Sequence, residues 1–103
     1  MKEERLQKIH DEIYESITEK QERWILLSLA FIEKYGQVRP TEVGVYMGRR
    51  KEIASAPVSA ALKKVLAMGV VERTRQGVYL QGKNTYTPKF EYEEEFQKQL
   101  QAV

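Results

Sequence analysis

Residues 55–64 read SAPVSAALKK, and they open the segment that decides the fold. Ser55 is a good N-cap and Pro57 is tolerated in a first turn, so a helix is predicted to begin here. Its buried stripe consists of Val58, Ala61, Leu62, Val65 and Leu66, and Gly69 closes it. A wheel at about 100° per residue places Ala56, Ala60, Lys63 and Ala67 on the opposite side. A chain with 31% charged residues thus leaves the outer face of one helix almost bare.

Composition narrows the class of protein. The 103 residues are enough for one domain with a modest core. They contain no run of 18 apolar residues and no apolar stretch near Met1, so neither a membrane span nor a secretory signal is expected. Cysteine is absent, which excludes disulfides and thiolate zinc sites and indicates a cytoplasmic protein.

No catalytic or cofactor site is expected either. The sequence contains no nucleophile elbow, no phosphate-binding glycine-rich loop and no cluster with metal-ligand spacing. His10 is the single histidine, and it lies in a charged helical segment. The acidic run 93–95 fits the solvated first turn of a helix, where carboxylates suit the helix dipole. The chain is therefore expected to be neither an enzyme nor a metalloprotein.

Charge is segregated along the chain. Residues 34–83 hold 10 basic and 3 acidic residues, net +7, whereas residues 1–33 and 84–103 are net −3 and −2. A basic middle between acidic ends predicts a surface that binds a polyanion.

The segments before residue 55 read mostly as helices. Leu6, Ile9, Ile13 and Ile17 form one apolar stripe. Thr18 and Gln21 have the form of a capping box, and the pattern fits either a second helix starting there or one unbroken helix. Residues 22–36 are apolar nearly all round, which predicts a central helix ending at Gly36. A short strand over 37–39 and a short helix from Pro40 to Gly48 follow.

Beyond residue 69 the pattern is that of a β-hairpin, with two possible registers. One has strands near 70–80 and 85–89, a turn at Gly82-Lys83-Asn84 and a bulge at Gly77. The other is a shorter hairpin turning at Gln76-Gly77. Tyr79 and Tyr86 are expected to pack within this hairpin. Residues 91–103 then form an amphipathic helix with Tyr92, Phe96 and Leu100 on its apolar side.

Three strings carry a resemblance to a known family: RPTEVGVYMG (39–48), SAPVSAALKKVLAMGVVER (55–73) and TYTP (85–88). Together they resemble a winged helix-turn-helix, over residues from about 20 to 90, and the middle string resembles the recognition helix and first wing strand of the bacterial and archaeal MarR/PadR-like regulators. The link GRRKEIA (48–54) is several residues longer than the tight turn usual there. The resemblance implies an α+β, mostly α fold in one domain, with a winged-helix core over 18–90 and added helices over 1–17 and 91–103.

The expected function is sequence-specific binding of double-stranded DNA. Small side chains let a helix approach the floor of the major groove, serine hydroxyls reach bases or phosphates, and lysines bind flanking phosphates. Arginines of the hairpin suit the backbone or the minor groove. The expected DNA contacts are Arg49, Arg50, Lys51, Ser55, Ala56, Ser59, Ala60, Lys63, Lys64, Arg73, Arg75, Lys83 and Asn84.

A homodimeric transcription regulator is the simplest protein of this kind. The terminal stripes are expected to form the dimer interface through Leu6, Ile9, Ile13, Ile17, Tyr92, Phe96 and Leu100, with a palindromic site matching the two-fold axis. One alternative is an architectural or plasmid-partition protein that coats DNA. Another, from a different class, is a winged-helix module for protein–protein interaction.

Overall fold

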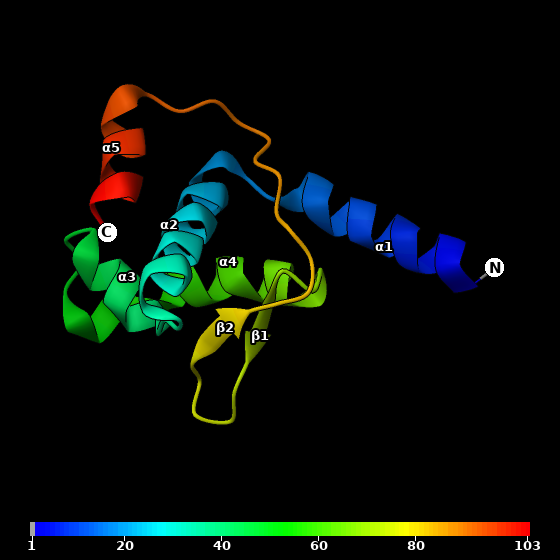
Figure 1. Cartoon of the computed structure of the whole chain (residues 1–103), viewed down its shortest axis with the longest axis horizontal. Helices are drawn as coiled ribbons and strands as arrows, with labels where there is room; N and C mark the ends of the chain where they lie inside the picture. The colour runs from blue at the N-terminus through cyan, green and yellow to red at the C-terminus, as the bar shows by residue number, and fades with distance from the viewer. Residues whose placement is uncertain (1) are drawn as a thin grey trace.

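The computed structural model describes residues 2–103, and this part of the chain is α+β and mostly helical, as predicted (Figure 1). Its elements are α1 (Lys2–Ser16), α2 (Glu19–Tyr35), α3 (Pro40–Tyr46), the 3₁₀ turn η1 (Lys51–Ile53), α4 (Ser55–Ala67), β1 (Val71–Arg73), β2 (Tyr79–Gln81) and α5 (Glu94–Ala102).

The N-terminal segment forms two helices and not one. Thr18 is extended, and its hydroxyl accepts from the Gln21 backbone N–H at 3.1 Å while the Gln21 side chain accepts from the Thr18 N–H at 3.1 Å. This reciprocal capping box starts α2 and breaks the chain from α1. Gly36, at φ 84°, ends α2 in the left-handed conformation that glycine adopts without strain.

The core lies where α2, α3 and α4 pack together. Val58, Ala61, Leu62 and Val65 of α4 are buried, as predicted, against Ile25 and Leu27 of α2 and Val43 of α3. The crossing of α3 and α4 depends on Gly44, because a Cβ there would stand 2.2 Å from the Ala54 carbonyl oxygen. The longer link between these helices is taken up by η1, which runs directly into α4.

The hairpin adopts the shorter of the two registers. Val71 pairs with Gln81 and Arg73 with Tyr79, and the turn is closed by Thr74 N–H to Val78 O at 2.9 Å and Gly77 N–H to Thr74 O at 3.1 Å. The predicted long strand over 70–80 and second strand over 85–89 are therefore wrong. Gly77, at φ 77°, lies in the turn and is no bulge.

Residues on both sides of β2 explain this register. Val38, in the predicted short strand 37–39, forms a single β-bridge with Tyr79. Asn84 lies far from the hairpin turn, because its amide donates to the Met68 carbonyl at 2.8 Å and its N–H to the Gly69 carbonyl at 3.0 Å. This residue thus satisfies carbonyls at the end of α4.

Residues 83–93, which we call the strap, run from β2 back over α2 to α5 (Figure 1). The fully buried Glu22 carboxylate of α2 holds this segment in place. It accepts from the hydroxyls of Tyr86 at 2.5 Å and Tyr92 at 2.7 Å, and from the backbone N–H groups of Lys89 at 2.9 Å and Phe90 at 3.1 Å. Burial alone raises the pKa of Glu22, but these hydrogen bonds outweigh it and the pKa lies below its usual value.

The C-terminal helix α5 folds back along α2 within the same chain. Phe96 is buried, and Tyr92 and Leu100 pack against the core. Arg23 of α2 pairs with Glu93 at 2.9 Å and lies over the Tyr92 and Phe96 rings. The apolar side of α5 is thus satisfied inside the protomer, which differs from its expected role in a dimer.

The stripe of α1 divides along its length. Ile17 is only 2% exposed and Ile13 is half-buried against the core, whereas Leu6 is 57% and Ile9 46% exposed. Ile17 and Phe96 are core residues, because the end of α1 and the whole of α5 are tied to α2 and the strap. Of the predicted dimer residues, Leu6 and Ile9 are the most exposed, and Leu100 is half-buried.

Replacing Glu22 with Gln tests the anchor of the strap. The amide keeps one acceptor oxygen but turns an NH₂ group toward hydroxyl and N–H donors. We expect the free energy of unfolding at pH 7 to fall by about 2–4 kcal/mol, since a hydrogen bond to a charged group contributes about 1.5–3 kcal/mol. Urea unfolding measures this, with Glu95→Gln, an exposed carboxylate of α5, as the control that changes little.

The same pair of variants gives a pH dependence. Because the folded pKa of Glu22 lies below the unfolded value of about 4.3, its contribution is fully present above that pH and is lost as pH falls through the folded pKa. The unmodified chain should therefore lose stability below about pH 4 more steeply than Glu22→Gln. Parallel curves for the two would contradict the anchoring role.

Candidate nucleic-acid interface

The outer face of α4 is as bare as the sequence predicts. Ala56, Ala60, Lys63 and Ala67 are exposed, and the opposite side of the helix is in the core. Ser59 is half-buried at the edge of this face. Small side chains thus occupy most of one side of a 13-residue helix.

The start of α4 differs from prediction by one residue. Ser55 is the first helical residue and not the N-cap, and no side chain caps the helix. The preceding residue, Ala54, already has helical angles (φ −72°, ψ −37°), because η1 continues into α4 without the extended residue that a capping serine needs.

The basic loop before α4 has one structural arginine and two exposed cations. Arg49 donates through Nε and Nη2 to the Ile53 carbonyl, at 3.2 and 3.1 Å, and so closes the loop around η1. Arg50 and Lys51 are exposed beside it. The loop therefore presents two charges to solvent from a braced backbone.

The hairpin holds a second group of arginines. Arg75 is exposed in the turn, and Arg73 is exposed with its guanidinium 5.9 Å from the Tyr79 ring centroid. Tyr79 is buried in the hairpin, as predicted. Tyr86 is also buried, but it belongs to the strap and contacts Glu22 and Tyr14, so its predicted place in the hairpin is wrong. Lys83 is exposed at the start of the strap and, like Asn84, lies away from the turn.

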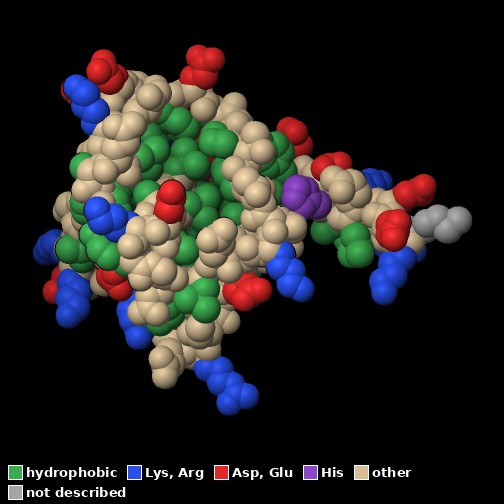
Figure 2. Space-filling model, in the orientation of Figure 1, with side chains coloured by type: hydrophobic (Ala, Val, Ile, Leu, Met, Phe, Trp, Pro, Cys, Tyr) green, Lys and Arg blue, Asp and Glu red, His purple; other side chains and the backbone are tan. Residues whose placement is uncertain are grey.

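Arg39 is a residue that sequence reasoning missed. It lies just before α3, and its Nη1 donates to the Gln76 carbonyl at 3.0 Å, so it braces the turn of the hairpin from outside. The basic composition of residues 34–83 includes it, but no local pattern pairs residue 39 with residue 76. Figure 2 shows basic side chains along the lower edge of the molecule, from the hairpin tip to the region of α3.

Lys64 is turned away from the bare face. Its Nζ donates to the Ser16 carbonyl and to the Gln21 side-chain oxygen, both at 2.8 Å. Lys89 of the strap does the same for the preceding carbonyls of α1, Tyr14 at 2.8 Å and Glu15 at 3.3 Å. Two cations thus hold the C-terminal end of α1, where the helix dipole favours positive charge. Lys64 was predicted to bind a DNA phosphate, but in the structure its ammonium group joins α4 to α1.

Other classes of site find no support in residues 2–103. This part of the chain contains no group of three or more His, Cys, Asp or Glu side chains arranged to hold a metal ion. Nor does it contain a helix whose length and apolar character would let it cross a membrane. Comparison of the chain with protein-family models, curated proteins and solved structures finds no match.

The adjacent lysines of α4 make a matched pair for stability. Lys64→Ala removes two hydrogen bonds to a part-buried ammonium and should cost about 1–2 kcal/mol, which corresponds to a fall in Tm of about 4–8 °C for each kcal/mol. Lys63→Ala changes an exposed side chain and should stay within about 0.5 kcal/mol. Thermal unfolding followed by circular dichroism ranks them, and the reverse order would overturn the assignment of the two roles.

Proposed function

We propose that this chain is a winged helix-turn-helix protein that binds double-stranded DNA sequence-specifically in the cytoplasm, most simply as a homodimeric transcription regulator and not as an enzyme. The observation that carries the proposal is the outer face of α4, which has mostly small side chains: Ala56, Ala60, Lys63 and Ala67. Exposed cations of the η1 loop precede α4 in the chain, and those of the hairpin follow it.

The dimensions of DNA explain why such a face would be useful. The major groove is about 12 Å wide and a helix with its side chains is about 10–12 Å across, so bulk on the leading face holds the backbone away from the bases. Alanine at positions 56 and 60 permits close approach and can touch a thymine methyl group. The hydroxyls of Ser55 and Ser59 can donate to bases or phosphates from the same end of the helix.

The hairpin supports the proposal through its turn. The shorter register puts Arg75 at the tip, where Arg39 braces the neighbouring Gln76 carbonyl. In a DNA complex this turn would lie along the backbone or the minor groove, whose negative potential attracts arginine. Arg50, Lys51 and Arg73 would then contact phosphates on either side of α4.

A homodimer would place two copies of α4 on one face of the DNA. The exposed apolar pair Leu6 and Ile9 supports this part of the proposal. Two-fold symmetry would space the helices by about 34–36 Å, one turn of B-DNA, and match them to a palindromic site.

Ala60→Leu tests the close approach of α4. The added bulk lies on an exposed face, so the fold should be unaffected, but affinity for a site selected from random DNA should fall at least tenfold, or about 1.4 kcal/mol. Ala102→Leu adds the same bulk to an exposed position of α5 and should leave affinity unchanged. Electrophoretic mobility shift measures both affinities. Equal affinity of Ala60→Leu and the unmodified chain would contradict the binding of α4 in the DNA major groove.

Salt dependence separates DNA binding from protein interaction. Because each neutralised phosphate releases counterions, Lys63→Ala and Arg75→Ala should each lower the slope of log affinity against log salt by about 1. Lys98→Ala, which removes an exposed cation of α5, should not change the slope. Unchanged affinity in Lys63→Ala/Arg75→Ala would favour the protein-interaction module instead.

A further inference from the structure

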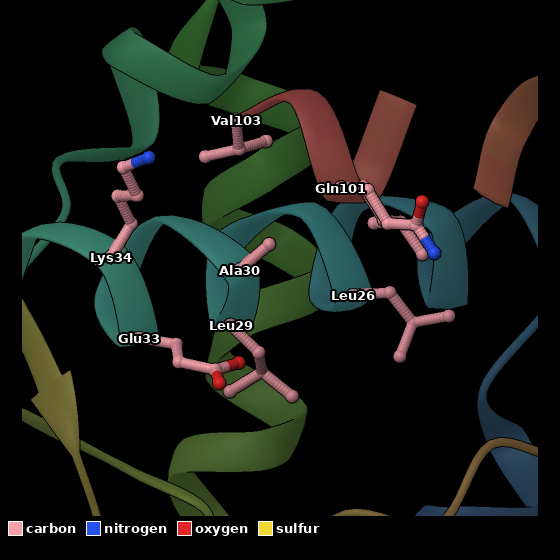
Figure 3. Close-up of a pocket in the computed structure, with 8 residues that line it drawn as sticks. Leu26, Leu29, Ala30, Glu33, Lys34, Gln101 and Val103 are labelled. Atoms are coloured by element: carbon pink, nitrogen blue, oxygen red, sulfur yellow. The ribbon is translucent and has the colours of Figure 1, made fainter. Parts of the chain in front are cut away.

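An apolar groove lies open on α2, on a different element from the candidate DNA-binding helix. Its floor combines Leu26, Leu29 and Ala30 of α2 with Leu100 and Val103 at the end of the chain, and it encloses about 760 Å³ (Figure 3). Figure 2 shows apolar side chains gathered on this face of the molecule, between α5 and the strap. Its polar lining residues are Glu33 and Lys34 of α2 and Gln101 of α5.

The first half of α1 has the complementary character. Leu6 and Ile9 are exposed on one side of the helix, continuing the stripe that Ile13 brings to the core. The hydrogen bonds that join α1 to the rest of the protomer come from its last turn, at Tyr14 and the two residues after it. A helix of 15 residues is marginal in water without tertiary packing, so its first turns need an apolar surface to lie on.

A protomer cannot bring these two surfaces together by itself. α1 projects away from the body of the molecule, with its N-terminal end far from α5 (Figure 1). Its direction is fixed by buried Ile17 and by the ammonium groups of Lys64 and Lys89 on its last carbonyls. The open stripe and the open groove therefore call for a second copy.

We propose that α1 of one copy lies in the α2–α5 groove of a second copy, and that the second copy returns its own α1 in the same way. Leu6 and Ile9 are then the apolar anchors, as in other helix-in-groove contacts. The exchange is reciprocal, so it closes as a two-fold dimer and leaves no groove open.

Charge and size agree with this occupant. Residues 2–16 hold 3 basic and 5 acidic residues, net −2. The groove region presents Lys34 and, where it continues toward the strap, Lys83, against the single acid Glu33. At about 1.5 Å per residue α1 is about 22 Å long, which lets Leu6 and Ile9, about two turns from its tethered end, reach a second copy.

A second apolar surface gives the competing arrangement. Phe31, Val45 and Tyr46 line a shallower and more apolar depression of about 480 Å³, formed between α2 and α3. If α1 docked there, Leu6 and Ile9 would contact α3 of the second copy and the α2–α5 groove would stay open. The groove is favoured because it is larger, and because the lysines of its region suit the net negative charge of α1, whereas the depression is lined by one acid and one base, Glu42 and Lys51.

Because the chain has no cysteine, single introduced thiols report the contact directly. Ile9→Cys and Leu29→Cys are made separately, mixed, and treated with a short bis-maleimide. We expect a covalent dimer from the mixture and none from either variant alone. Circular dichroism checks that each variant is folded, and Val45→Cys mixed with Ile9→Cys is the matched control for the second surface.

Three results would overturn the inference. The first is the absence of a covalent dimer from the folded mixture. The second is cross-linking of Ile9→Cys to itself, which would mean that α1 pairs with α1. The third is cross-linking of Ile9→Cys to Val45→Cys. The inference rests on the homodimer in the proposed function and not on DNA binding. Two measurements on Leu6→Glu therefore separate the proposals. Light scattering tests the dimer and is expected to give a monomeric mass. The salt dependence of its DNA affinity tests DNA binding independently.

Discussion

The buried carboxylate of Glu22 is the constraint on which most of this structure depends. A carboxylate accepts several hydrogen bonds, and here two tyrosine hydroxyls and two consecutive backbone N–H groups of the strap fill that capacity. Each of those donors would be costly to bury without a partner. The strap therefore has one place to lie, and its path delivers α5 to α2 and Lys89 to the end of α1.

The sides of α4 have different contacts. Its inner side belongs to the core, and its flank carries Lys64, which joins the helix to the α1–α2 junction. Only the outer side, with Lys63 and three alanines, is left for a partner. The direction of α1 and the orientation of α4 are thus coupled through one ammonium group. In the proposed dimer, that coupling would set the distance between the two copies of α4.

Features that depend on local pattern could be predicted from the sequence. The apolar stripe and the bare face of α4, the capping box at Thr18 and the α+β class all follow from periodicity and capping chemistry. Features set by contacts distant in sequence could not. The hairpin register was open because Gly77 and Gly82 both permit a turn, and the choice follows from Asn84 binding the end of α4.

Side-chain roles were the least predictable part. A helical wheel places Lys64 beside Lys63, yet a long side chain at the edge of a face can turn to whichever carbonyls lie in reach. In the sequence, Glu22 is one of several charges on a central helix, and no local pattern shows that it binds the strap. The link between Arg39 and Gln76 likewise exists only once Val38 pairs with Tyr79.

A hydroxyl-radical footprint on DNA selected from random sequence tests the central claim most directly. The account predicts two protected half-sites about one helical turn apart on one face of the duplex, related by a palindrome and weakened by salt. Protection that spreads continuously along the DNA would contradict a closed dimer and favour a coating protein. Failure to select any sequence, or to protect DNA at low salt, would contradict DNA binding by α4 altogether.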